Sequence, residues 1–290
     1  MSAIASLPEH HQPLGRLSKE PRLAKRVAII TGASQGFGQA IAIRFVEEGC
    51  KVVLVSRRGC DATMKILSTI EGVANVDDIA LDVKCDIGKE DMIKILYAKV
   101  EEKFGPALHV LVNNAAMFVF HSVETASAKD WANSCNVNII GSAMMTKHAL
   151  PLLKKGAEDV PGGATVVFQG SISSFLAQPN CVTYSATKAA ILQLAKNCAY
   201  DLAKYNIRVN TVCAGTVETP ISKVERASHG WTFEEWEKLK VKDVMLRRVG
   251  NTREVANATL FYASSESSYC TGGFLMVDGG QTSCTVMTDD

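Results

Sequence analysis

Residues 26–38 read Arg-Val-Ala-Ile-Ile-Thr-Gly-Ala-Ser-Gln-Gly-Phe-Gly, an apolar run that leads directly into a loop with three glycines. The apolar run predicts a buried strand, and the segment from residue 38 onward predicts a helix. Glycine at the junction lets the backbone turn sharply and lets a pyrophosphate approach without a Cβ in the way. The first N–H groups of the helix are free to bind that anion. The loop therefore predicts dinucleotide binding by six residues: Gly32, Ser34, Gln35, Gly36, Phe37 and Gly38.

The same order of strand and helix repeats along the rest of the chain. Short apolar runs rich in β-branched residues predict seven strands, at residues 26–31, 51–55, 79–85, 109–113, 164–169, 207–212 and 274–278. Longer segments between them predict helices, among them 38–48, 89–104, 128–155, 183–205 and 252–264. Nearly continuous hydrophobicity is typical of strands covered on both faces, and strand–helix alternation implies parallel pairing. We therefore predict an α/β fold, a doubly wound seven-stranded parallel sheet of the Rossmann type with helices on both faces.

The bulk composition fits one globular domain. No linker or repeat interrupts residues 26–281, so we predict one domain there, a flexible extension at 1–25 and a tail at 282–290. A net charge of +1 gives no reason to expect nucleic acid or an anionic membrane as a partner, and no apolar stretch is long enough to span a bilayer. The nine cysteines form no CxxC pair, which favours reduced thiols and a cytoplasmic protein. A mitochondrial presequence in the N-terminal segment is the alternative.

The end of the second predicted strand bears on the choice of nucleotide. In NAD-binding proteins an acidic residue at this place holds the ribose 2′-hydroxyl. This chain has Ser56, Arg57 and Arg58 there instead, with no acid. A guanidinium is able to bind a 2′-phosphate through charge-assisted hydrogen bonds. The sequence therefore favours NADP(H), and NAD(H), with both arginines simply solvated, is the alternative.

Two further motifs and a serine follow the glycine loop in order. Asn113-Asn114-Ala115-Ala116 follows the fourth predicted strand, and Tyr184-Ser185-Ala186-Thr187-Lys188 opens a long helix, with Ser171 thirteen residues before the tyrosine. Together with the GxxxGxG spacing of the loop, they resemble the short-chain dehydrogenase/reductase family over about residues 25–281. The chain departs from the family pattern at Ala116, where glycine is usual, and at Ala214-Gly215, where the family has Pro-Gly. Neither departure removes a reacting group.

The resemblance implies an NAD(P)-dependent oxidoreductase that interconverts a secondary alcohol and a ketone. It implies a catalytic tetrad of Asn138, Ser171, Tyr184 and Lys188, of which Tyr184 and Lys188 also contact the cofactor. It also places further residues around the nucleotide: Asp86 and Ile87 at the adenine, Asn113 and Ala115 at the ribose, and Gly215, Val217 and Thr219 near the nicotinamide. A nucleotide-binding sensor that has lost its activity is the rival interpretation, and the intact tetrad argues against it.

The tetrad offers an acid/base without a metal ion, and no cluster of His, Cys and Asp predicts a metal site. A free tyrosine has a pKa near 10, so a catalytic phenol must be made more acidic. Lys188 is one helical turn from Tyr184, and at ~6 Å its charge would lower the phenol pKa by ~2 units, with oxidised nicotinamide adding to the effect. Ser171 would donate a hydrogen bond to the substrate oxygen. By the family resemblance, Asn138 would connect Lys188 to solvent through a water molecule.

The segment 217–247 is the expected lid over the substrate, on the plan of the resembled family. It carries Trp231, Phe233 and Trp236 among charged residues, and the alternative is a surface helix that packs its own aromatic side chains. An apolar pocket favours a hydrophobic or cyclic alcohol or ketone. The candidate substrate contacts are Phe118, Phe120, Ser171, Ser173, Gln178 and Trp231.

The helix predicted at 183–205 bears on assembly. Its positions away from the active side, such as Ala190, Leu194 and Cys198, are apolar, and an exposed apolar face usually needs a partner. The resembled family commonly forms homotetramers through this helix. We therefore expect a homotetramer, with a dimer as the alternative.

Overall fold

A computed structural model describes residues 21–283, and all seven predicted strands are found there. The strands are β1 (Val27–Thr31), β2 (Lys51–Ser56), β3 (Ala80–Lys84), β4 (Val110–Asn113), β5 (Ala164–Ser171), β6 (Ile207–Ala214) and β7 (Phe274–Val277). They form one parallel sheet in the order β3-β2-β1-β4-β5-β6-β7. The order reverses between β1 and β4, and in α/β sheets ligands bind beyond the carboxyl ends of the strands at such a point. The predicted doubly wound fold is confirmed.

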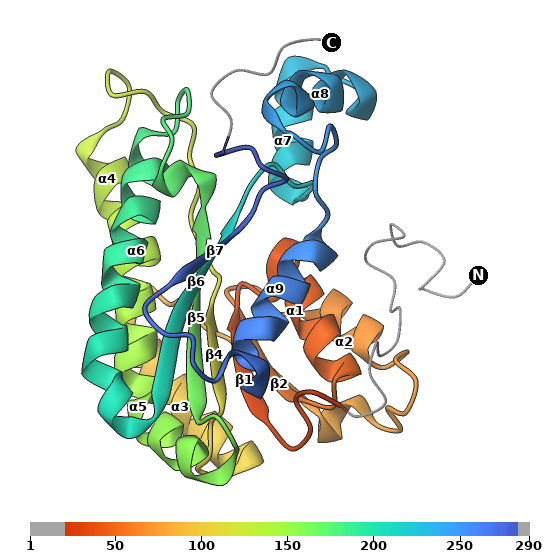
Figure 1. The fold of residues 1–290 in the computed structure, drawn as a ribbon, viewed down its shortest axis with the longest axis vertical. Coiled ribbons are helices and arrows are strands. Elements are labelled where there is room, and N and C mark those ends of the chain that lie inside the picture. The colour runs from red at the N-terminus through yellow and green to blue at the C-terminus, as the bar shows by residue number, and fades with distance from the viewer. Residues whose placement is uncertain (1–20, 284–290) are drawn as a thin grey trace.

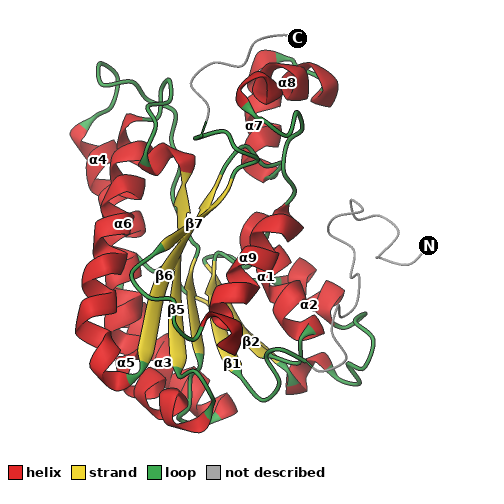
Figure 2. Ribbon diagram, in the orientation of Figure 1, coloured by secondary structure: helices red, strands yellow, loops and turns green. Residues whose placement is uncertain are grey.

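Helices cover both faces of the sheet (Figures 1 and 2). They are α1 (Gly36–Glu47), α2 (Asp61–Leu67), α3 (Glu90–Phe104), α4 (Ala128–Cys135), α5 (Ser142–Asp159), α6 (Val182–Leu202), α7 (Pro220–His229), α8 (Phe233–Lys240) and α9 (Thr252–Ala263). In Figure 1, α3, α5 and α6 lie on one face and α1, α2 and α9 on the other. Neighbouring residues of a strand serve opposite cores, because side chains alternate across a sheet: Ile29 and Val53 lie in the first core, and Ile30 and Val52 in the second.

The single helix predicted at 128–155 is interrupted. After α4 the chain makes a π-helical turn, Asn136–Gly141, and continues as α5 to Asp159. A π turn widens the helix by one residue per turn, and such turns occur frequently at functional sites. The 3.6-residue hydrophobic pattern does not reveal this turn because the helix continues on both sides of it.

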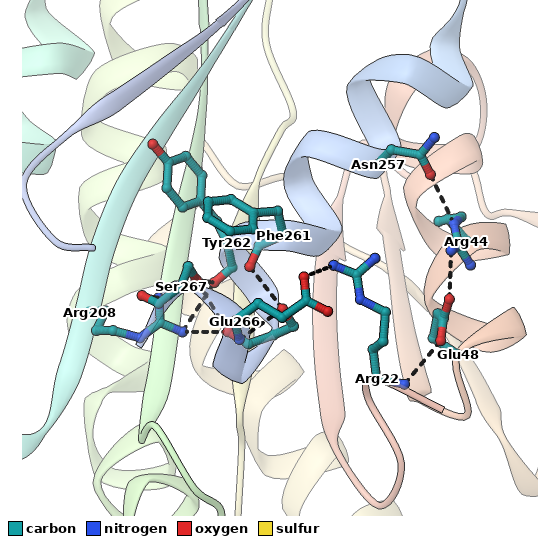
Figure 3. Close-up of polar contacts among 10 residues, drawn as sticks. Arg22, Arg44, Glu48, Arg208, Asn257, Phe261, Tyr262, Glu266 and Ser267 are labelled. Carbon is teal, nitrogen blue, oxygen red and sulfur yellow. Dashed lines mark hydrogen bonds and ion pairs between the residues drawn. The ribbon is translucent and has the colours of Figure 1, made fainter. Parts of the chain in front are cut away.

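Residues 21–25 belong to the folded domain, which corrects the prediction of a flexible extension reaching to residue 25. Leu23 is fully buried, and its N–H donates to the carbonyl of Glu48 (3.0 Å). The backbone N–H of Arg22 donates to the Glu48 carboxylate (2.9 Å), which is also paired with Arg44 of α1 (Figure 3). Arg44 and Glu48 are completely buried, so this pair fastens the N-terminal segment to the domain. The rest of the predicted extension lies outside the described residues.

The predicted lid folds as α7 and α8, above the carboxyl ends of the strands in Figure 1. Its base is closed by pairing of Val217 with Gly250, and the Gly250 N–H donates to the carbonyl of Thr216 (2.9 Å). A capping box of Thr232 and Glu235 starts α8. The lid is therefore a helical insertion whose two ends meet.

Two observations concern the chain as a whole. Among residues 21–283 no helix is long and apolar enough to cross a membrane. The eight cysteines in this part of the chain are all free thiols.

Candidate active site

A cavity of about 1210 Å³ lies at the carboxyl end of the sheet. Its walls come from the glycine loop, the ends of β2, β4, β5 and β6, the first turns of α6, and the lid. Ligand sites of ordinary size occupy roughly 300–1,000 Å³. The volume therefore has room for a nucleotide and a substrate together.

The glycine loop forms one end of the cavity. A Cβ at Gly38 would lie 2.2 Å from the carbonyl oxygen of Gly32, so only glycine allows this crossing of helix and loop. Gly32 and Gly36 have φ of +68° and +58°, in the left-handed region that favours glycine. The N-cap residue Gln35 makes no side-chain hydrogen bond to α1, and the first turn of α1 has no acidic residue. The loop and the helix N-terminus thus fit a diphosphate, although Gly38 itself does not line the cavity.

The end of β2 lies beside this loop. Arg57 and Arg58 are exposed and line the cavity, and neither makes a hydrogen bond or ion pair with any residue in the described range 21–283. Ser56 also lines the cavity, and its hydroxyl is bonded to the backbone of Gly59 (2.9 Å). Two uncommitted guanidinium groups are therefore available to an anion at the nucleotide end.

The predicted adenine and ribose contacts are mostly at the cavity wall. Asp86, Ile87 and Ala115 line it, but Asn113 does not. The Asn113 side chain is buried and donates to the hydroxyl of Thr146 (3.0 Å). This corrects the placement of Asn113 beside the ribose, because its amide is turned into the protein.

The neighbouring Asn114 lines the cavity in its place. Its side chain donates to the carbonyl of Thr31 (2.8 Å), which ties β4 to the glycine loop. From sequence, either asparagine of the pair could have had this role.

Ser171, Tyr184 and Lys188 line the middle of the cavity. Ser171 ends β5, and Tyr184 and Lys188 lie one turn apart on α6. The Ser171 hydroxyl donates to Ser173 (3.1 Å), and Ser173 donates in turn to Gln178. The three predicted reacting groups are therefore in one place, with a hydrogen-bonded chain behind the serine.

The ionisation of these groups differs from the expectation. Burial raises the pKa of Tyr184 to about 12, and the hydrogen bond with Ser171 only partly opposes that rise. Burial lowers the pKa of Lys188 to about 8. The lysine Nζ donates to the carbonyl of Gln169 (2.6 Å) and lies 5.5 Å from the centre of the Tyr184 ring. Loss of water disfavours the charged forms of both groups, so the phenol is less acidic here, not more acidic as expected.

Asn138 lies behind the cavity wall. Its side-chain oxygen accepts from the N–H of Met117 (2.7 Å), and its amide donates to the Met117 carbonyl (3.0 Å) and the Thr187 hydroxyl (2.9 Å). Thr187 donates to the carbonyl of Tyr184 (2.8 Å). These bonds join the segment around Met117 to the first turn of α6, and the link from Asn138 to Lys188 through a water molecule stays a prediction.

The substrate end of the cavity is largely apolar. Phe118 contacts Tyr184 and Phe120 edge to face, with ring centres 4.6 Å apart in each pair. Every predicted substrate residue lines the cavity, including Ser173, Gln178 and Trp231. The lid also contributes residues that sequence reasoning missed as cavity contacts: Ile221, Glu225, Leu239, Lys240 and Asp243.

A polar cluster holds the two lid helices together. The indole N–H of Trp236 donates to Glu225 (2.9 Å), and Lys240 pairs with the same carboxylate (2.8 Å). Trp236 is buried, packs against Phe233 and also lines the cavity. The lid aromatics thus both pack with one another and face the cavity, so the two predicted alternatives are each partly right.

Comparison with known proteins places the chain in a family. A family model described as enoyl-(acyl carrier protein) reductase matches residues 32–282. A human protein named dehydrogenase/reductase SDR family member 4 is 32% identical over 93% of this chain and 91% of its own length. The chain belongs to the short-chain dehydrogenase/reductase family. The resemblance predicted from the motifs is confirmed.

Other members of the family share most of their length with this chain. An NADP-dependent (R)-specific alcohol dehydrogenase from Lentilactobacillus kefiri is 36% identical over 90% of this chain and 98% of its own. The ligand-free structure of an aldohexose dehydrogenase from Thermoplasma acidophilum matches with a TM-score of 0.77 and 29% identity, over 93% of this chain and 100% of its own. The protein is therefore a short-chain oxidoreductase acting on CH–OH groups, which disfavours the rival interpretation as a sensor.

Proposed function

We propose that the protein is an NADP(H)-dependent oxidoreductase that interconverts a secondary alcohol and a ketone. One observation carries the proposal: Ser171, Tyr184 and Lys188 line the same cavity as the glycine loop. A reacting carbon placed beside the phenol is thus within the cavity that has room for the nucleotide. The similarity to an NADP-dependent alcohol dehydrogenase supports the same conclusion.

The choice of NADP(H) rests on the end of β2. Nicotinamide, when bound, supplies or accepts the hydride. Arg57 and Arg58 line the cavity without a partner among residues 21–283, and the residues 57–60 that directly follow β2 include no acid to repel a 2′-phosphate. Charge-assisted hydrogen bonds to that phosphate would favour NADP(H) over NAD(H).

Tyr184 is the proposed acid and base. In the reducing direction its hydroxyl donates a proton to the substrate oxygen as the carbinol forms, and in the oxidising direction the phenolate takes that proton. A pKa of about 12 keeps the phenol protonated at neutral pH, so the resting protein is ready to act as the acid.

Ser171 would stabilise charge on the same oxygen. Its hydroxyl donates to Ser173 and would turn to the substrate oxygen on binding. Lys188 keeps its ammonium group at the base of the cavity, bonded to Gln169, where it stabilises negative charge on Tyr184 once the phenol gives up its proton.

Turnover of uncharged, bulky ketones tests the proposal. We expect NADPH oxidation with cyclic or aryl ketones and a drop in kcat of roughly 10²–10³ in Ser171→Ala, because a donor to the developing alkoxide is lost. An exposed serine on another element, as in Ser68→Ala, is the control. No turnover of any ketone or alcohol with either nucleotide would overturn the proposal, as would a Ser171→Ala enzyme as fast as the wild type.

We also propose a homotetramer. Along α6, Ala190 and Leu194 are half-buried and Tyr200 is exposed, and the π turn that contacts α6 exposes Ile140. These apolar side chains suit contact with further copies of the chain. Light scattering coupled to size exclusion should give four times the 31.2 kDa chain mass, and a monomer would contradict the proposal.

A further inference from the structure

Asn136 connects two parts of the cavity that are distant in sequence. It begins the π-helical turn between α4 and α5, and its side-chain amide donates to the carbonyl of Gly88 (3.1 Å). Gly88 follows Asp86 and Ile87, which line the nucleotide end of the cavity. The N–H of Gly88 is held by the Asp86 carboxylate (3.0 Å). The amide of Asn136 and the carboxylate of Asp86 thus hold Gly88 from two sides.

The loop and the π turn touch at a second point. A Cβ at Gly141 would lie 2.8 Å from the carbonyl oxygen of Ile87, and a Cβ at Gly88 would lie 2.7 Å from the Asn136 side-chain nitrogen. Both ends of the π turn therefore pack closely against the backbone of residues 87 and 88. Little room is left for one segment to move without the other.

The same turn also reaches the catalytic end. Asn138, two residues after Asn136, holds both backbone groups of Met117 and the hydroxyl of Thr187. Met117 precedes Phe118, whose ring packs on Tyr184. A rigid path thus runs from the loop 86–88 through the π turn to the surroundings of the phenol.

We propose that Asn136 is a positioning residue that couples the geometry of the nucleotide-binding loop 86–88 to the placement of Met117 and Tyr184. Its side chain does not line the cavity. Its amide fixes the loop on one side, and the π turn transmits that position to Asn138 on the other. This inference rests on the proposed function for its catalytic part only, since nucleotide binding is measured without turnover.

The variant Asn136→Asp separates this role from ordinary packing. The shape is kept, but an acceptor replaces the donor opposite the Gly88 carbonyl and adds a negative charge near the Asp86 carboxylate. Asn133→Asp is the matched control, because Asn133 is exposed on α4 one turn earlier and does not line the cavity. Asn136→Ala, which removes the donor without adding charge, is the second variant if the aspartate prevents folding.

Three measurements follow on the wild type and each folded variant. Calorimetry with ADP-ribose reports binding of the nucleotide part without nicotinamide, steady-state kinetics at saturating NADPH report kcat, and thermal unfolding reports stability. We expect the dissociation constant of ADP-ribose to rise roughly tenfold and kcat to fall roughly threefold to tenfold in Asn136→Asp, with smaller changes in the same direction in Asn136→Ala. Asn133→Asp should match the wild type in both.

A folded Asn136 variant that loses stability but keeps both wild-type ADP-ribose affinity and wild-type kcat would overturn the proposal, because its role would then be structural. A change in only one of the two would also overturn it, since the coupling requires both. If the wild type binds ADP-ribose but turns over no ketone, the proposed function fails instead, and the binding measurement still decides whether Asn136 fixes the loop.

Discussion

The two ends of the cavity are built by different kinds of contact. At the nucleotide end, the close contacts are between backbone segments. The backbone of Gly38 packs so closely on Gly32 that an added Cβ at Gly38 would lie 2.2 Å from the Gly32 carbonyl oxygen. At the lid end, side chains make the structure, with Trp236 and Lys240 bonded to Glu225 across α7 and α8. Backbone crossings tolerate no added atom, whereas side-chain clusters allow graded change. The nucleotide end should therefore respond to substitution abruptly and the lid end gradually.

The largest effect is expected from Gly38→Ala. Its methyl group would have to displace the Gly32 carbonyl, which opens the phosphate-binding turn. We expect the dissociation constant of NADPH to rise roughly 100-fold or more, equivalent to about 2.7 kcal/mol. Gly273→Ala is the control, because its added Cβ would meet Asn210 at 3.6 Å, an ordinary contact. If calorimetry finds the same NADPH affinity in both variants, the claim that the nucleotide end tolerates no added atom at Gly38 is wrong.

The next effect tests charge at the same end. Arg57→Asp should raise the KM for NADPH roughly tenfold to 100-fold, because one charge-assisted hydrogen bond becomes a repulsion, while the KM for NADH stays the same or falls. Lys238→Asp makes the same change in charge on α8 at a residue that does not line the cavity. If NADPH and NADH respond equally to Arg57→Asp, the 2′-phosphate contact is wrong.

Lys188 lies between the two ends of the cavity, and we expect it to lower the free energy of unfolding at neutral pH. Burial depresses its pKa to about 8, so between pH 8 and 10.5 the unfolded chain binds more protons than the folded one, and wild-type stability rises with pH. Lys188→Met should therefore be inactive yet more stable at pH 7, by on the order of 2 kcal/mol. That advantage should shrink as the pH rises through this window. Urea unfolding at pH 7 and pH 10 checks it, and a variant less stable than the wild type at both would contradict it.

The smallest effect is expected at the lid. Trp236→Phe keeps a buried ring but loses the indole N–H that donates to Glu225. We expect the substrate KM to rise roughly twofold to fivefold, with NADPH affinity unchanged. Trp131→Phe on α4, away from the cavity, is the control. A loss of NADPH affinity in Trp236→Phe would show that the two ends are not separable in this way.

The same contrast explains what sequence alone could predict. The strands and the glycine loop depend on local patterns, so residues 26–38 were sufficient to predict a strand, a turn and a helix there. The lid segment was located, but its two helices and the cluster around Glu225 depend on contacts between residues eleven or more positions apart. The burial of Leu23 likewise depends on Glu48, which nothing near residue 23 indicates.

The properties of the catalytic residues also depend on contacts that local sequence patterns do not reveal. Its members were predicted from motif spacing, and Ser171, Tyr184 and Lys188 do lie together. The pKa of Tyr184 could not be predicted, because one helical turn of separation gives the distance to Lys188 but not the loss of water around both groups. Asn113 was misplaced for a related reason. Which way an amide turns depends on partners such as Thr146 and Thr187 on other elements.

The central claim is that Tyr184 exchanges the proton with the substrate oxygen, and the pH dependence of kcat/KM for alcohol oxidation by the wild type and Tyr184→Phe tests it most directly. We expect a rising limb in the wild type with an apparent pKa well below 12, because the charges of Lys188 and bound oxidised nicotinamide both favour the phenolate. In Tyr184→Phe the limb should disappear and the rate should fall by roughly 10²–10⁴. A Tyr184→Phe enzyme that keeps the wild-type rate and the same limb would contradict the account.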